Sequence, residues 1–88
     1  MTHYIQKESF DTTQLDGEWI ILDAEHFTVT KLNEMGGFCW SLLKEKQTVG
    51  SIIQSIEAEF QGDLSVDAKD IEVFLKDLIE YGLVIHAV

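Results

Sequence analysis

The side chains that most often perform catalysis or bind metals are few and scattered in this sequence. The three histidines, His3, His26 and His86, have no cysteine or carboxylate at a recurring ligand spacing. Cys39, the one cysteine, stands beside Trp40, and nothing near it in the sequence lowers a thiol pKa, which favours a small buried apolar role. No triad, P-loop or dinucleotide loop is present. We therefore expect no metal site, no cofactor and no enzyme activity.

The charge of the chain excludes further classes of function. Six lysines face sixteen carboxylates, no arginine is present, and the net charge is -10. Arginine is the preferred group for bidentate contacts with phosphate and guanine, so nucleic acid is an unfavourable partner. An anionic membrane surface is disfavoured by the same electrostatics. Basic peptides and basic protein surfaces remain as partners.

One stretch that combines acidic, apolar and aromatic residues is a candidate binding surface. Asp70, Val73 and Asp77 recur at i, i+3 and i+7, and Tyr81 lies one turn further. A solvated acidic helix face explains this pattern. Composition alone favours this interpretation. The wall of a peptide groove beside an edge strand is the alternative, and spacing does not separate the two.

The first third of the sequence has the patterns of strands. The 88 residues fit a single domain over 1–88. His3 to Phe10 alternates weakly and predicts a short first strand, and the polar stretch Asp11–Gly17 predicts a loop that ends in an Asp-Gly turn. Trp19–Leu22 and Phe27–Leu32 are rich in strand-forming residues and predict a hairpin.

The rest of the sequence predicts three helices. Asn33, Thr48, and either Ser65 or Asp67 stand at N-cap positions, and apolar residues follow each at helical spacing. Glycine follows the second and third helices. Gly36 and Gly37 fall in the first turns of the first helix, where close packing or a distorted first turn explains them better than phosphate binding does. Leu83–Ile85 is too short to distinguish strand from coil.

Together these elements predict an α+β fold that is winged helix-turn-helix-like, with a three-stranded antiparallel sheet followed by three α-helices. A small sheet with a free edge beside a helix is a receptor for an extended peptide.

A single cysteine, no signal-peptide pattern and no apolar run of membrane-spanning length predict a cytoplasmic protein.

The ordered set of apolar, glycine and capping residues over about 17–84 resembles the PqqD-like family, also called RiPP precursor-peptide recognition elements. The resemblance rests on Leu32-Asn33, Gly36 or Gly37, Trp40, Leu43, Thr48-Val49, Ile53, Phe60, Asp70-Ile71, Phe74-Leu75, Leu78 and Gly82-Leu83. Members of that family are non-catalytic. They bind the leader part of a ribosomally synthesised precursor peptide as an added strand on the third strand, beside the third helix.

The resemblance therefore implies a leader-peptide site between Phe27–Leu32 and the helix Asp67–Tyr81. The residues it implies for this site are Phe27, Thr28, Val29, Thr30, Lys31, Leu32, Asp70, Val73, Phe74, Asp77 and Tyr81. Their acidic members suit a leader that carries lysine or arginine. Phe74 has the alternative of a purely structural role in the core.

The resemblance leaves several functions open. A stand-alone member of this size is most similar to the leader-binding subunit of lasso-peptide biosynthesis, which delivers the precursor to a separate leader protease. The alternative within the family is the PQQ-biosynthesis peptide chaperone, which serves a radical SAM enzyme. Outside the family, an acidic winged-helix module that binds a basic protein remains, as does a DNA-binding winged helix, which the charge opposes.

Overall fold

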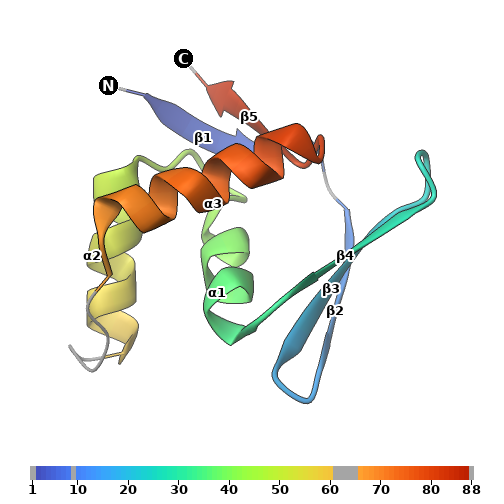
Figure 1. Ribbon diagram of the computed structural model, residues 1–88, viewed down its shortest axis with the longest axis horizontal. Coiled ribbons are helices and arrows are strands. Elements are labelled where there is room, and N and C mark those ends of the chain that lie inside the picture. Colours follow the sequence, from blue (N-terminus) through green and yellow to red (C-terminus); the bar gives the residue numbers. More distant parts are fainter. Residues whose placement is uncertain (1, 9, 61–65, 88) are drawn as a thin grey trace.

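The computed structural model describes residues 2–8, 10–60 and 66–87. Within these residues the chain is an α+β protein with three helices and two small antiparallel sheets (Figure 1). In chain order the elements are β1 (His3–Gln6), β2 (Asp11–Leu15), β3 (Glu18–Asp23), β4 (Thr28–Leu32), α1 (Glu34–Leu42), α2 (Val49–Phe60), α3 (Ala68–Glu80) and β5 (Val84–Ala87). The chain thus differs from the expected order of strands followed by helices, because a strand also follows α3.

The three-stranded sheet has the order β2-β3-β4. The loop predicted over 11–17 was wrong, because Asp11–Leu15 is strand β2 and pairs along its whole length with β3. Asp16 and Gly17, with φ of 49° and 81°, form the two-residue turn between these strands, as an Asp-Gly pair favours. Every residue of β2 is exposed, so the strand has no alternation of apolar and polar residues that would reveal it.

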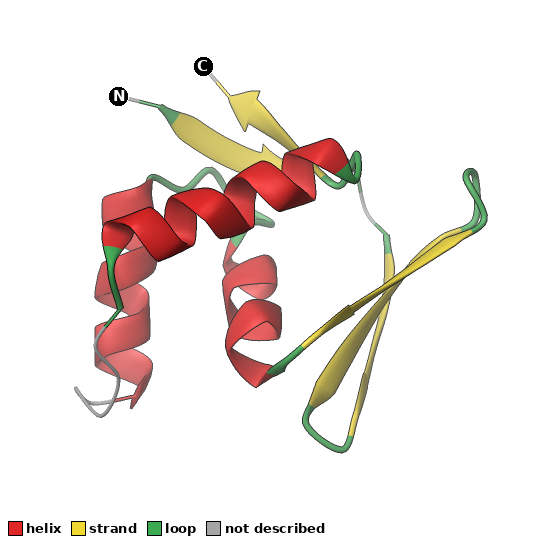
Figure 2. Cartoon of the chain, viewed as in Figure 1, coloured by secondary structure: helices red, strands yellow, loops and turns green. Residues whose placement is uncertain are grey.

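The second sheet joins the two ends of the chain. Strand β1 pairs with β5 and not with the hairpin strands. Of the 83–85 segment that the sequence left undecided, Val84 and Ile85 are the first two residues of β5. The other side of β1 pairs with Gln47. The Tyr4 N–H donates to the Gln47 carbonyl at 2.8 Å, and the Tyr4 carbonyl accepts from the Gln47 N–H. The first and last strands therefore form one two-stranded sheet that lies beside α3 (Figure 2).

Helix α1 begins where the sequence predicts. The Asn33 side chain accepts a hydrogen bond from the Gly36 N–H at 2.7 Å, which caps the first turn. A Cβ atom at Gly37 would overlap three atoms of the Trp19 indole, so only glycine permits this contact between α1 and β3. The prediction that these glycines serve close packing is confirmed at this position.

The caps of α2 and α3 are also confirmed. Thr48 and Ser51 exchange hydrogen bonds between their side-chain oxygens and each other's N–H, at 2.9 and 3.0 Å. Asp67 caps α3, and its carboxylate accepts from the Lys69 N–H. Gly82, with φ of 77°, ends α3 in the left-handed conformation. The alternative cap Ser65 and the glycine stop expected after α2, at 61–62, lie outside the described residues.

The core lies where the three helices and both sheets meet. Trp40 is 1% exposed, its indole Nε1 donates to Thr12 Oγ1 at 3.3 Å, and its carbonyl accepts from the Gln6 side chain at 2.8 Å. This one residue therefore ties α1 to β2 and β1. Cys39 is buried beside it, and burial raises its pKa to about 11, so the thiol stays protonated as the sequence led us to expect.

Candidate functional site

Strand β4 is an outer strand of the three-stranded sheet. It pairs with β3 on one side, and no described strand pairs with its other side. In an antiparallel strand, alternate residues direct their N–H and C=O groups away from the partner. The free side of β4 therefore presents backbone donors and acceptors to any extended chain that lies against it.

A pocket of about 420 Å³ runs along this strand. It is lined by Thr28, Val29, Thr30, Lys31 and Tyr81. Tyr81 is the C-cap of α3 and its side chain is 59% exposed. The structure thus brings together four strand residues that the sequence singled out and the aromatic residue at the end of the helix.

The remaining helix candidates divide into two groups. Asp70, Val73 and Asp77 are exposed on α3, as a solvated or ligand-facing stripe requires. Phe74 is half-buried and packs against the core. A Cβ atom at Gly36 would lie 3.3 Å from Leu32 Cβ and 3.4 Å from Phe74 Cε1, so α1, the end of β4 and α3 meet closely there. The structural role considered for Phe74 is therefore present.

The expectation that Phe27 lies in the strand was wrong. Phe27 falls in the turn before β4, its φ is 54°, and it is 93% exposed. Asp23 fixes this turn: its Oδ1 accepts from the N–H groups of Glu25 and His26 at 3.1 and 3.2 Å. The pocket along β4 does not include Phe27 in its lining. Its role in peptide binding stays a prediction.

The same turn contains a titratable pair. His26 Nδ1 lies 2.8 Å from Asp23 Oδ2, and this hydrogen bond raises the pKa of His26 above its usual 6.5 and lowers the pKa of Asp23. The Asp23 side chain is 5% exposed and that of His26 is 60% exposed. The pair was missed in the sequence because three residues of separation in a turn carries no periodic signal.

The pair predicts a pH dependence of the turn. The pKa of His26 is higher in the folded chain, so its contribution to stability is complete below 6.5 and is lost as pH rises through the raised value. An NMR titration should give His26 a pKa above 6.5 that falls in Asp23→Asn. The matched change Asp16→Asn, in the other turn, should leave it in place. A His26 pKa at or below 6.5 in the unmodified chain contradicts the hydrogen bond.

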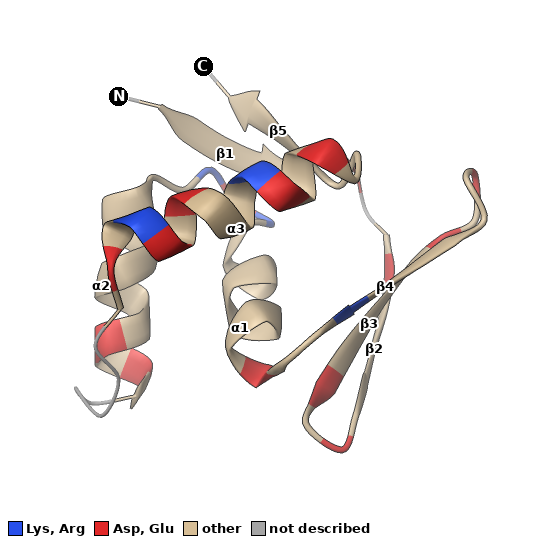
Figure 3. Ribbon diagram, viewed as in Figure 1, with Lys and Arg blue, Asp and Glu red and all other residues tan. Residues whose placement is uncertain are grey.

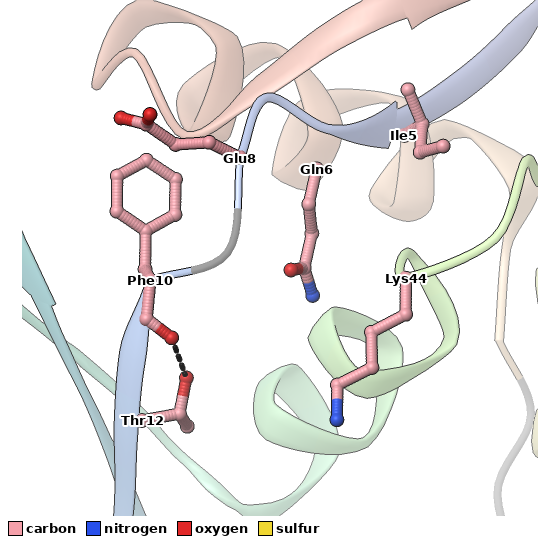
Figure 4. Close-up of a pocket in the computed structure, with 6 residues that line it drawn as sticks. All are labelled: Ile5, Gln6, Glu8, Phe10, Thr12 and Lys44. Carbon is pink, nitrogen blue, oxygen red and sulfur yellow. Dashed lines mark hydrogen bonds between the residues drawn. The ribbon is translucent and has the colours of Figure 1, made fainter.

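A second cavity, of about 520 Å³, lies at the opposite edge of the sheet. It is lined by Ile5, Gln6, Glu8, Phe10, Thr12 and Lys44. Figure 4 shows Phe10 and Thr12 on one side of it, Lys44 on the other and Gln6 between them. The Gln6 amide is engaged with the Trp40 carbonyl. Five of these residues lie between positions 5 and 12, and Lys44 comes from the turn after α1.

Among the described residues, no cluster of three or more histidine, cysteine or acidic side chains is arranged to hold a metal ion. In the same residues no helix is long and apolar enough to cross a membrane. What the β4 pocket offers is a free strand edge, an aromatic wall and neighbouring carboxylates. These are features of a peptide-binding groove.

The comparison with protein families identifies the family of this chain. The family described as Coenzyme PQQ synthesis protein D (PqqD) matches residues 18–84. The chain belongs to the PqqD family. The matched span begins at the first residue of β3 and includes β4, all three helices and Tyr81, so both walls of the β4 pocket lie within the PqqD region.

A solved structure supports the same assignment. It is described as TbiB1 in complex with the TbiA(beta) leader peptide, and it matches this PqqD-family chain with a TM-score of 0.73 and 27% sequence identity. The match covers 91% of this chain and 93% of the TbiB1 chain. A comparison with curated proteins found no match.

Proposed function

We propose that this protein binds the leader segment of a ribosomally synthesised precursor peptide without catalysing a reaction. The leader adds as a strand to the free side of β4 and lies beside α3. The observation that carries the proposal is the pocket that joins this strand edge to Tyr81, in a chain similar to a protein solved with its leader peptide. The proposal includes the winged helix-turn-helix assignment, with α3 as the helix beside the sheet.

The groove combines two sources of affinity. Backbone hydrogen bonds along β4 are available to any extended peptide, whatever its sequence. Selectivity comes from the side chains that alternate along the added strand, because every second one faces Tyr81 and the exposed side of α3. The carboxylates of Asp70 and Asp77 on that helix, in a chain of net charge -10, favour a leader with lysine or arginine.

The protein then delivers the bound precursor to a partner enzyme in the cytoplasm. We propose that this partner is a leader protease in lasso-peptide maturation, because the chain is strongly acidic, with a net charge of -10. The description of the family as a coenzyme PQQ synthesis protein favours a second candidate, a peptide chaperone that serves a radical SAM enzyme. The leader that the protein binds distinguishes the two.

The test is a fluorescence-anisotropy titration with labelled leaders from a lasso precursor and from a PQQ precursor. Saturable binding of one leader is expected, and the Val29→Glu variant should weaken it, because a longer charged side chain replaces an apolar residue that lines the groove. Failure of folded protein to bind either leader would refute the proposal. It would redirect the search to basic protein partners of an acidic interaction module.

The helix wall is tested by reversing one charge. Asp77→Lys should weaken binding of a leader that carries lysine or arginine by roughly three- to tenfold at low salt, because an exposed attraction becomes a repulsion. Raising the salt concentration should shrink the difference. Glu57→Lys makes the same change on the exposed side of α2 and should have a much smaller effect. Equal losses in both variants would mean that only net charge matters.

A further inference from the structure

The sheet has a second surface, which shares only the β4 residues Val29 and Lys31 with the leader groove. Side chains of β3 alternate between its faces, and Ile21 and Asp23 are buried on the face that α1 covers. Figure 1 shows all three helices on that one side of the sheet. The opposite face, here called the outer face, consists of Asp11, Thr13, Leu15, Glu18, Ile20, Leu22, Val29 and Lys31, by the pairing of β2, β3 and β4.

The outer face has an apolar centre. Leu22 and Val29 are directly opposite each other across β3 and β4, and they are 41% and 59% exposed. Ile20, which is half-buried, follows Leu22 on the same face, and Leu15 is 57% exposed near the turn of the first hairpin. Neighbouring apolar side chains that no element of the described chain covers mark an interaction surface on a domain of this size.

The rim of this surface is acidic. Asp11 and Glu18 lie on the face itself, and Asp16 and Glu25 lie in the two turns that end it. Figure 3 shows acidic positions at both ends of the three-stranded sheet, and the basic residue of β4 is Lys31. A second copy of this chain is a poor occupant, because each copy brings a net charge of -10. A surface with an apolar centre and a lysine or arginine rim is the complementary one.

The outer face is continuous with the leader groove through β4. A peptide strand added to β4 extends the sheet by one strand, and alternate side chains of the peptide then stand beside Val29 and Lys31. The other peptide side chains face α3. A protein that docks on the outer face therefore contacts this chain and the bound leader together.

We propose that the outer face is the docking surface for the enzyme that acts on the precursor, and that this enzyme meets it with an apolar patch bordered by lysine or arginine. The inference rests on the proposed function, since the bound leader supplies part of the surface. The enzyme should accordingly bind the complex with leader more tightly than it binds this protein alone.

The test measures binding to the enzyme that belongs with whichever leader binds, a lasso leader protease or the PQQ radical SAM enzyme. The immobilised enzyme is titrated with unmodified protein, Leu22→Lys and Ile85→Lys, each with and without saturating leader. Ile85 is 44% exposed on β5, so it matches Leu22 in exposure but lies on the other sheet. Leu22→Lys should weaken enzyme binding by about tenfold or more, the loss typical of an apolar anchor at the centre of an interface.

The controls separate this inference from the proposed function. Ile85→Lys should bind the enzyme within about twofold of the unmodified protein, and both variants should keep their affinity for the leader. If Leu22→Lys leaves enzyme binding unchanged, the docking-surface proposal is wrong. It is also wrong if the leader binds but the enzyme does not, and in both cases the proposed function stands. If light scattering shows a concentration-dependent dimer that the Leu22→Lys variant does not form, the outer face binds a second copy of the chain and the docking-surface proposal is wrong. Absence of leader binding refutes the proposed function itself.

Discussion

Replacing Gly37 by alanine is expected to lower the free energy of unfolding by about 2–3 kcal/mol, although the change adds one methyl group to a helix. The new Cβ would overlap the Trp19 indole, so α1 and β3 must move apart or the indole must leave its position. Overpacking of this kind is destabilising by about 1–3 kcal/mol. For a domain of this size the melting temperature should fall by roughly 10–20 °C, as measured by circular dichroism.

Gly50→Ala is the matched control. Gly50 lies in the first turn of α2, is exposed, and has only Thr48 Oγ1 within 4 Å of its Cβ position, at 3.8 Å. Alanine has the higher helix propensity, so this variant should gain about 0.5 kcal/mol. A Gly37→Ala protein as stable as the unmodified chain would mean that α1 does not approach Trp19 as closely as described, and that the position of the adjacent β4 is not fixed by this contact.

Replacing Tyr81 by alanine is expected to weaken leader binding by roughly thirtyfold, or about 2 kcal/mol, the loss typical of an aromatic hot spot. Tyr81 is the one helix-end residue that lines the β4 pocket, and its removal leaves the groove open on that side. The fold should tolerate the change, because the side chain is largely exposed and the capping hydrogen bonds use the backbone N–H of residue 81.

Tyr81→Phe separates the ring from its hydroxyl group. If the ring forms the wall, the phenylalanine variant should keep most of the affinity in the same anisotropy titration. Thermal unfolding of both variants should stay close to that of the unmodified protein. Unchanged leader affinity in Tyr81→Ala would place the leader elsewhere on the molecule.

The helices could be predicted from the sequence because each carries independent local signals. Asn33, Thr48 and Asp67 cap them with short side-chain hydrogen bonds, and the apolar stripes that follow are buried as expected. Capping and periodicity act within one or two turns, so a single sequence contains the information. The packing role of Gly37 was predicted for the same reason, although its partner Trp19 was not.

The strands were less accessible to prediction. Strand β2 has no buried residue, and β5 pairs with the far end of the chain, so neither has a local apolar pattern that identifies it. Pairing between distant segments is decided by tertiary contacts. The position of Phe27 was missed because the carboxylate of Asp23, a side chain four residues earlier, closes the turn around it.

The candidate site likewise combines residues that were named before the structure was known with others that depend on tertiary contacts. The family resemblance named residues 28–31 as the strand wall of the site, and the structure places them in one pocket, while their role in binding stays a prediction. Their connection with Tyr81 followed from the family resemblance, since spacing along α3 does not show which strand the helix faces. The outer face required the register of all three strands, because exposure of Leu22 and Val29 on one side depends on how β3 and β4 are aligned.

The measurement that tests strand addition most directly is residue-by-residue amide hydrogen exchange, by NMR, of the protein with and without saturating leader. Alternate amides of Thr28–Leu32, those directed away from β3, should exchange more slowly when the leader is bound, because each donates to the added strand. Amides of β2, at the other edge of the same sheet, serve as the internal control and should be unchanged. Bound leader with unprotected β4 amides, or with protection along β2, would contradict the groove proposed here.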